Sequence, residues 1–247
     1  MIKQYGLIGY PLSHSFSGKY FSEKFNKENI SDCRYDLFEI DSIDKVSSVF
    51  SRSNLKGFNV TIPYKHDIMS FMDLFDHSAE KVGAVNVVKI NPDGSRTGFN
   101  SDYYGFRISL EKWLPKNFNS GAFVLGIGGA AKAVMAVLED LKIEYLKISR
   151  NKEKGDFDYE ELRANPGILK NHKLIINTTP LGMSPNIDVQ PNLDYEQMDG
   201  SFYLYDLIYN PSETKFMYLG KKHGANVKNG LEMLELQAEK SWEIWNS

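Results

Sequence analysis

Polar side chains that could bind a small polar molecule recur at the ends of expected strands in the first part of the chain. The stretch FNVTIPYK reads as a strand that Pro63 ends, because proline has no N–H to donate to a neighbouring strand. Polar groups at the strand ends of an α/β sheet tend to converge on one crevice. One such residue alone indicates only an ordinary surface position. Their recurrence favours a site that includes Asn59, Thr61, Lys65, Asn86, Asn100 and Asp102.

The glycine turn in VLGIGGAAKAV is a second candidate site, with the pattern Gly126-x-Gly128-x-x-Ala131. It directly follows an expected buried strand and opens a helix, which is where a dinucleotide-binding fold holds a pyrophosphate. The glycines let the chain turn and let the backbone approach the ligand, while free N–H groups at the helix start bind the anion. A tight turn without a ligand has the same local pattern, but this context favours a dinucleotide.

The residues after the next strand indicate which dinucleotide binds. NAD-binding folds usually have Asp or Glu at this place to bond the ribose hydroxyls, whereas this chain has Ser149, Arg150 and Asn151. A guanidinium group can hold a 2′-phosphate with its planar set of donors. The sequence therefore predicts NADP rather than NAD. The alternative is that Arg150 is a solvated loop charge.

Metal and hydrolase sites are poorly supported by the spacing of residues. The five histidines show no HxH, HxxxH or HExxH pattern, and Cys33 is the only cysteine, so no metal is expected. No GxSxG turn of a serine hydrolase is present. Ser13 and Ser15 in GYPLSHSFS could bind a carboxylate or cap the helix that follows, and capping is the simpler interpretation when they are taken alone.

Alternating strand-like and helix-like segments must position these groups, so the fold class is α/β. A helix at residues 101–114 leads from a first region with a small sheet to a strand–helix run that starts near residue 121. That run is typical of a doubly wound parallel sheet. In the first region, strands are expected at residues 4–9, 35–40, 57–62, 84–90 and 94–99.

Composition excludes several classes of partner. The chain has 247 residues, of which 42% are hydrophobic and 25% charged, so a packed globular protein is expected. The net charge of −3 argues against binding to nucleic acid or to an anionic membrane. Lys132 interrupts the longest apolar tract, and the N-terminus lacks the features of a signal peptide. With a single cysteine, these features predict a cytoplasmic protein that binds a small molecule.

Seven blocks of the chain resemble the shikimate dehydrogenase family. They are GYPLSHSFS, FNVTIPYK, GAVNVV, GFNSD, GIGGAA with SRN, INTTPLGM, and DLIYNPSET followed by NGLEMLELQA, and they span nearly the whole chain. FNVTIPYK and DLIYNPSET are highly specific to the family. The resemblance implies a substrate domain at residues 1–102, which the C-terminal helix (about 226–247) joins, and an NADP-binding Rossmann domain at 103–225. It places the active site in the cleft between them.

The resemblance also implies an activity and residue roles. The reaction would be the reversible NADPH-dependent reduction of 3-dehydroshikimate to shikimate, in the route to chorismate and aromatic amino acids. Lys65 and Asp102 would be the catalytic pair. Substrate binding would involve Ser13, Ser15, Thr61, Lys65, Asn86, Asp102, Tyr209 and Gln237, and cofactor binding would involve Gly126, Gly128, Gly129, Ala130, Ala131, Ser149, Arg150, Asn151, Ile208 and Gly230.

Some alternatives stay open at this point. Ser149-Arg150-Asn151 stands where the family usually has Asn-Arg-Thr, which keeps Arg150 but changes its neighbours, so an NAD-using quinate/shikimate dehydrogenase is a second reading. A non-catalytic NADP-binding regulatory module is a third, although such a module would need neither Lys65 nor Asp102. The residues do not decide whether Lys65 transfers the proton or stabilises charge. They are compatible with a monomer or a homodimer.

Overall fold

The computed structural model describes residues 2–12 and 16–247, and the chain forms two compact units. Unit 1 comprises Met1–Tyr104 with Gln237–Ser247, and unit 2 comprises Gly105–Leu236. Each unit has its own β-sheet covered by helices, so the expected α/β fold is confirmed. The sequence predicts that residues 226–247 join the first domain. In the structure residues 226–236 cluster with unit 2, because strand β11 (Asn226–Lys228) pairs with its sheet.

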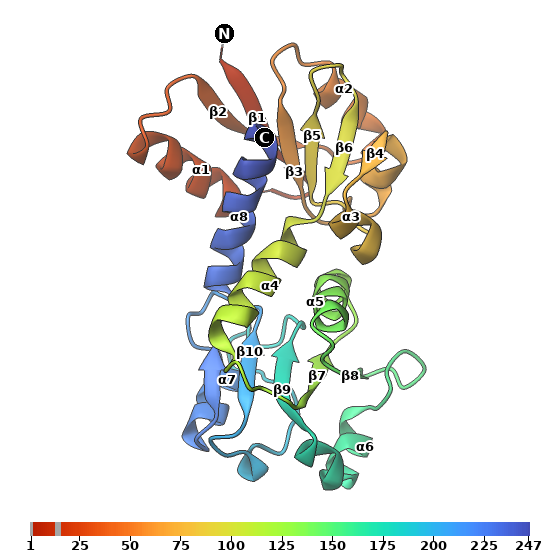
Figure 1. Ribbon diagram of the computed structural model, residues 1–247, viewed down its shortest axis with the longest axis vertical. Coiled ribbons are helices and arrows are strands. Elements are labelled where there is room, and N and C mark those ends of the chain that lie inside the picture. The colour runs from red at the N-terminus through yellow and green to blue at the C-terminus, as the bar shows by residue number, and fades with distance from the viewer. Residues whose placement is uncertain (1, 13–15) are drawn as a thin grey trace. The chain divides into compact units, whose positions relative to one another are not determined.

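A six-stranded mixed sheet forms the centre of unit 1 (Figure 1). Strand β1 runs parallel to β2 and β3, whereas β5 runs antiparallel to β3 and β6. Strand β4 is not among the expected strands, because two residues are too few to show a period of two. In spatial order the strands are β2 (Cys33–Glu39), β1 (Lys3–Gly9), β3 (Gly57–Val60), β5 (Val87–Ile90), β6 (Arg96–Phe99) and β4 (Leu74–Phe75).

Side chains of alternating direction give this sheet two apolar faces. On one face Tyr5 stacks with Trp245 of α8 at a centroid distance of 4.9 Å, and Phe21 of α1 joins the same cluster. On the other face Ile8 and Phe58 pack with residues of α2 and α3. The helices and short 3₁₀ turns are α1 (Phe16–Lys27), η1 (Ile43–Lys45), α2 (Val46–Phe50), η2 (Asp67–Phe71), α3 (His77–Val82) and the part of α8 (Leu231–Asn246) that starts at Gln237.

Unit 2 contains a five-stranded sheet in which all strands are parallel. Strand β7 comes first in the chain. Strand β8 lies on one side of it, and β9, β10 and β11 follow in that order on the other side. This order confirms the doubly wound arrangement, and the change of direction beside β7 is where such sheets bind ligands. In spatial order the strands are β11 (Asn226–Lys228), β10 (Tyr203–Asp206), β9 (His172–Asn177), β7 (Gly121–Leu125) and β8 (Tyr145–Ile148).

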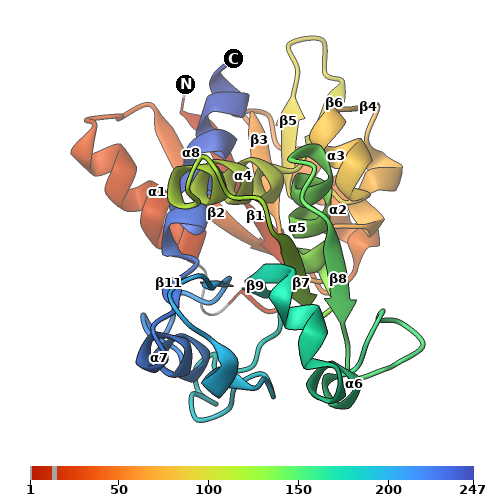
Figure 2. The ribbon, with the colours of Figure 1, turned by 60° about the horizontal axis from the view of Figure 1, so that its bottom comes forward.

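Helices cover both faces of this second sheet (Figure 2). Phe106 of α4 contacts Tyr205 on one face, and Phe216 of α7 packs with Phe123 on the other. The segment at residues 158–170 forms two short helices, because Pro166 cannot donate the N–H that would continue the first one. The helices are α4 (Ser101–Trp113), α5 (Gly129–Asp140), α6 (Tyr159–Ala164), η3 (Pro166–Lys170), η4 (Tyr195–Gln197) and α7 (Lys215–Lys222).

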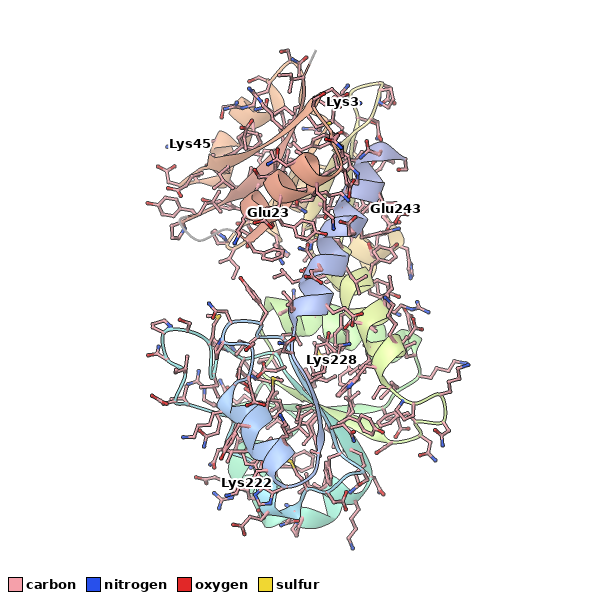
Figure 3. The ribbon with its side chains drawn as sticks, turned by 90° about the vertical axis from the view of Figure 1, so that its left-hand side faces the viewer. Lys3, Glu23, Lys45, Lys222, Lys228 and Glu243 are labelled. Carbon is pink, nitrogen blue, oxygen red and sulfur yellow. The ribbon has the colours of Figure 1, made fainter. Side chains whose placement is uncertain are left out.

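The edge strand β11 leads directly into the last helix. Lys228 forms an ion pair with Glu232 in the first turn of α8, and Figure 3 labels Lys228 at this point of the chain. Gly230 separates strand from helix, and a Cβ atom there would lie 2.1 Å from the carbonyl oxygen of Leu207. Glycine is therefore required by the close approach of two backbone segments. Within the described residues, none of the helices has both the length and the apolar character needed to cross a membrane.

Candidate functional site

The strand order of unit 1 gathers polar residues from three places in the sequence. Because β5 is antiparallel to both β3 and β6, the start of β5 lies beside the ends of the other two strands. The backbone N–H of Val60 donates to the carbonyl of Asn86 at 2.8 Å, and the N–H of Asn86 donates to Phe99 at 3.0 Å. Thr61, Asn86 and Asn100 therefore lie at one edge of the sheet.

Lys65 and Asp102 form an ion pair at this edge. The Nζ atom of Lys65 lies 2.6 Å from Oδ2 of Asp102, and their side chains are 31% and 20% exposed. The N–H of Val85 donates to the carbonyl of Lys65 at 2.8 Å, which ties the turn after β3 to the segment before β5. A partly shielded ammonium group beside a carboxylate can stabilise negative charge on a ligand and exchange protons with it.

Asn100 fixes the helix that carries Asp102. Its Oδ1 atom accepts from the N–H of Tyr103 at 3.1 Å, so it caps the start of α4. Its Nδ2 atom donates to the carbonyl of Ala84 at 2.9 Å, and its own N–H donates to Ser78 at 3.0 Å. Asn100, expected to line the site, thus acts in the structure as a buried support for the first turn of α4.

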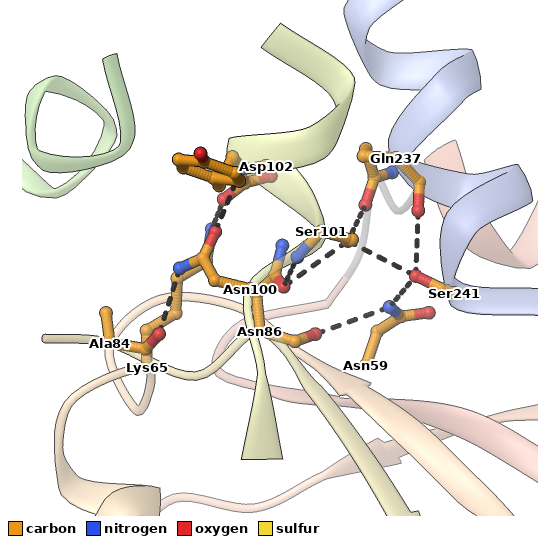
Figure 4. Close-up of polar contacts among 10 residues, drawn as sticks. Asn59, Lys65, Ala84, Asn86, Asn100, Ser101, Asp102, Gln237 and Ser241 are labelled. Atoms are coloured by element: carbon orange, nitrogen blue, oxygen red, sulfur yellow. Dashed lines mark hydrogen bonds and ion pairs between the residues drawn. The ribbon is translucent and has the colours of Figure 1, made fainter. Parts of the chain in front are cut away.

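Asn86 and Gln237 are brought together through Ser101 (Figure 4). Oδ1 of Asn86 accepts from the N–H of Ser101 at 2.6 Å, and Oε1 of Gln237 accepts from the Ser101 hydroxyl at 3.2 Å. The amide nitrogens of Asn86 and Gln237 have no protein acceptor among the described residues. Because no buried polar side-chain atom there lacks a partner, these two nitrogens face accessible space. They are free to donate to a ligand.

Three other residues expected at this site are Thr61, Ser13 and Ser15. The N–H of Thr61 donates to the carbonyl of Ile8 at 2.9 Å, and its side chain is half-buried at the end of β3. Ser13 and Ser15 lie outside the described residues. Within residues 2–12 and 16–247, His, Cys, Asp and Glu side chains form no cluster of three or more that could hold a metal ion.

Unit 2 has a pocket of about 370 Å³ near the carboxyl ends of β7, β8 and β9. It contains five of the residues expected to bind the cofactor: Gly126, Gly128, Ser149, Arg150 and Asn151. The guanidinium group of Arg150 is exposed and forms no ion pair with any described residue. The wall also includes Ile127, Ile148, Tyr159, Thr178, Thr179, Pro180 and Leu181, to which the sequence analysis assigns no role.

The glycine turn has the geometry that a pyrophosphate requires. Gly126 has φ of +91°, and a Cβ atom there would lie 2.8 Å from Cγ2 of Thr179, so only glycine fits. A Cβ atom at Gly128 or Gly129 would meet nothing within 4 Å, so the backbone is open on that side. Helix α5 begins at Gly129, and its first N–H groups have no partner inside the helix. Ala131, behind the turn, is fully buried.

Asp206 is a buried carboxylate at the end of β10, and the sequence pattern assigns it no role. Oδ1 accepts from Nδ2 of Asn177 and from the N–H of Ile208, both at 3.0 Å, and Oδ2 accepts from the Thr214 hydroxyl at 2.6 Å. Burial raises the pKa of Asp206 to about 6. Oδ1 of Asn177 in turn accepts from the N–H of Thr179 at 3.0 Å. Asp206 therefore joins the turn after β10 to the lining of the pocket.

Three further expected residues, Ile208, Tyr209 and Gly230, lie in unit 2 outside the pocket lining. Ile208 is buried, Tyr209 is 39% exposed, and both belong to the turn that Asp206 holds. The N–H of Gly230 donates to the carbonyl of Ile208 at 3.0 Å, so this turn is also attached to the start of α8. Contact of Ile208 and Gly230 with a nicotinamide ring, and of Tyr209 with the substrate, stays a prediction.

Known proteins resemble this chain over nearly its whole length. Residues 7–88 match the family described as the shikimate dehydrogenase substrate binding domain. The shikimate dehydrogenase (NADP(+)) of Clostridium beijerinckii is 40% identical, over 98% of this chain and 91% of that protein.

Solved structures agree in both fold and sequence. A shikimate dehydrogenase crystallised with NADP+ is 33% identical with a TM-score of 0.81, covering 99% of this chain and 90% of the other. The Listeria monocytogenes shikimate 5-dehydrogenase, solved with shikimate and NAD, is 28% identical with a TM-score of 0.89, covering 99% and 92%. Sequence identity above 30% over almost the full length, together with this shared fold and the arrangement of both sites, shows that the chain belongs to the shikimate dehydrogenase family.

Proposed function

We propose that the protein catalyses the reversible, NADP-dependent interconversion of 3-dehydroshikimate and shikimate, a step on the route to chorismate and the aromatic amino acids. The observation that carries the proposal is the Lys65–Asp102 ion pair. Asp102 directly follows Ser101, which binds both Asn86 and Gln237. A charged pair beside two free amide donors suits a ligand that has several hydroxyl groups and one reacting oxygen.

Unit 1 would bind the substrate and unit 2 the cofactor. The free amide nitrogens of Asn86 and Gln237 and the hydroxyl of Thr61 supply hydrogen bonds for ring hydroxyls. Ser13 and Ser15, with Tyr209, are proposed to hold the carboxylate of the substrate. The match of residues 7–88 to a substrate-binding domain supports this division of roles.

The pocket of unit 2 fits NADP. Gly126, Gly128 and Gly129, with the start of α5, would hold the pyrophosphate, and Ser149 and Arg150 would hold the 2′-phosphate. The bound cofactor supplies or removes the hydride. Because the Arg150 guanidinium is exposed and forms no ion pair with the described residues, it can bind a phosphate without first breaking another contact. This favours NADP over the NAD-using quinate/shikimate alternative.

Lys65 and Asp102 would act on the reacting oxygen of the substrate by stabilising its charge and exchanging its proton. During reduction the carbonyl oxygen of the substrate gains negative charge, and the Lys65 ammonium group stabilises it and can give it a proton. The Asp102 carboxylate, 2.6 Å from Nζ, orients that group and can accept a hydrogen bond from a substrate hydroxyl. In the oxidising direction the same groups hold the hydroxyl and receive its proton.

Turnover with defined substrate and cofactor pairs tests the proposal. The wild-type protein is mixed with shikimate or quinate and with NADP or NAD, and formation of the reduced nicotinamide is followed by its absorbance. We expect the highest kcat/KM with shikimate and NADP. Higher kcat/KM with quinate and NAD would favour the second reading. Binding of NADP without turnover on any pair would support a regulatory module and refute the proposed activity.

The oligomeric state of the protein and its location in the cell are predicted separately from the activity. A cytoplasmic location stays a prediction from the single cysteine, and assembly as a monomer or homodimer stays a prediction beside it. Sedimentation of the purified protein at several concentrations measures the oligomeric state directly.

A further inference from the structure

A chain of hydrogen bonds lies behind the amide groups of Asn86 and Gln237 (Figure 4). It runs from Asn59 through Ser241 to Ser101, all of which are buried and belong to unit 1. The direction of such a chain, meaning which group donates and which accepts in each hydrogen bond, decides what the chain presents to the site. Each hydroxyl or amide has a donor on one side and an acceptor on the other. The geometry determines that direction at each step.

Asn59 has only one orientation that satisfies its neighbours. One atom of its amide group lies 3.3 Å from the carbonyl oxygen of Asn86, where only a nitrogen can form a hydrogen bond. Oδ1 therefore faces the hydroxyl of Tyr35, which donates to it at 2.8 Å. Nδ2 also donates to the Ser241 hydroxyl oxygen at 2.9 Å. The proton of Ser241 must then point elsewhere, and the carbonyl of Gln237 accepts it at 2.8 Å.

The backbone of Ser101 determines the orientation of Asn86. A backbone N–H can only donate, and this one lies 2.6 Å from Oδ1 of Asn86. Nδ2 of Asn86 must therefore point away from this N–H. Replacing the side chain of residue 101 does not remove this bond, because it comes from the main chain.

The hydroxyl of Ser101 determines the orientation of Gln237. It has a single proton and three acceptors within reach, Oε1 of Gln237 at 3.2 Å and, at 3.3 Å each, Oδ1 of Asn86 and Oγ of Ser241. Oδ1 of Asn86 already accepts from the backbone N–H of Ser101, and Oγ of Ser241 already accepts from Nδ2 of Asn59. Oε1 of Gln237 is therefore the better acceptor, and its amide then presents Nε2 to the ligand.

We propose that Ser101 is a positioning residue: its N–H orients Asn86 and its hydroxyl orients Gln237, so that both amides offer only N–H groups to the substrate. This inference rests on the proposed function, since it concerns recognition of the same substrate. It assigns the donor and the acceptor of each hydrogen bond between these residues and the substrate. The substrate oxygens that face Asn86 and Gln237 act as acceptors, and the carboxylate of Asp102 is the group that accepts a substrate O–H.

Double-mutant cycles with shikimate test this assignment. Ser101→Ala removes the hydroxyl but keeps the N–H, so it should raise the Kd and KM for shikimate about fivefold to tenfold and leave the KM for NADP unchanged. In a Gln237→Ala background the same substitution should change shikimate binding less than twofold. In an Asn86→Ala background it should have its full effect.

Ser101→Thr and Ser101→Val form the matched control pair, because the two variants have the same shape and differ only in the hydroxyl. The Thr variant should keep wild-type affinity for shikimate, and the Val variant should show the loss seen with Ala. This pair also serves if Ser101→Ala folds poorly. The Tm of each variant is measured so that loss of folded protein is separated from loss of affinity.

Two results would overturn the assignment. One is an effect of Ser101→Ala that is as large in the Gln237→Ala background as in the wild type. The other is a coupling to Asn86 that equals or exceeds the coupling to Gln237. Failure of the proposed function is distinguished beforehand, because wild-type protein that neither binds nor oxidises shikimate would refute that function without any variant.

Discussion

Nζ of Lys65 lies 2.6 Å from Oδ2 of Asp102, so an ion pair joins the turn after β3 to the first turn of α4. The two residues are 37 positions apart in the chain. Lys65→Ala removes the positive charge that is proposed to stabilise the reacting oxygen. We expect kcat to fall by about 10²- to 10⁴-fold and the KM for shikimate to change far less. Steady-state kinetics in the oxidising direction measures both, and an unchanged kcat would remove Lys65 from the mechanism.

The role of Lys65 in proton transfer is tested by Lys65→Arg. Arginine keeps the positive charge but does not release its proton at ordinary pH. If the main role of Lys65 is to hold charge, Lys65→Arg should retain at least tenfold more kcat than Lys65→Ala. Equal loss in the two variants would instead assign the proton transfer itself to Lys65.

Arg150 is expected to distinguish the two nicotinamide cofactors. Charge-assisted hydrogen bonds to a phosphate are strong, so Arg150→Ala should raise the KM for NADP about 10- to 100-fold while changing that for NAD less than threefold. Lys154→Ala is the matched control, because Lys154 is an exposed cation of the same loop that does not line the pocket. Equal losses with NADP and NAD would argue against a 2′-phosphate contact.

Substitutions of the two glycines Gly126 and Gly128 should have different effects on stability. Gly126→Ala puts a side chain at φ of +91° and within 2.8 Å of Thr179, so the Tm should fall along with cofactor binding. Gly128→Ala meets no protein atom within 4 Å, so the Tm should stay within about 2 °C of wild type. Its KM for NADP should still rise, because the methyl group occupies the open side of the turn. Normal NADP binding by Gly128→Ala would place the pyrophosphate elsewhere.

Asp206 should make stability depend on pH. Burial raises its pKa from 3.8 to about 6, so the native state holds the proton more tightly than the unfolded chain does. The stabilisation from this proton is complete below the unfolded pKa and is lost as pH rises through about 6. Between pH 4 and 7, the free energy of unfolding of wild type should fall by up to about 3 kcal/mol relative to Asp206→Asn, which cannot titrate.

Urea unfolding of both proteins across this pH range measures the difference. The comparison with Asp206→Asn removes the opposite contribution of carboxylates such as Glu232 and Asp76, whose pKa values are lowered in the folded state and which are present in both proteins. A difference that stays constant with pH would show that Asp206 keeps its ordinary pKa.

The local pattern was enough to predict the larger elements and the positions of the chemical groups. Continuous apolar runs and glycine turns indicate a parallel sheet, because strands covered on both faces need no polar side. The same pattern identifies the turn at Gly126 and the residues Ser149 and Arg150, since each comes directly after an expected strand in the chain. The short strands β4 and β11 were missed, because two or three residues show no period and their pairing depends on a distant partner.

The tertiary structure decided which polar residues touch. The local sequence does not indicate that the N–H of Ser101 donates to the side chain of Asn86. That contact depends on the register of β5 against β6. Asp206 is part of a motif that carries the family resemblance, yet its burial follows from packing around three separate segments. Hydrogen bonds between residues far apart in the chain depend on strand order and helix packing. The sequence by itself therefore determined which candidate reacting and binding groups the chain carries, and the fold decided their partners and their direction.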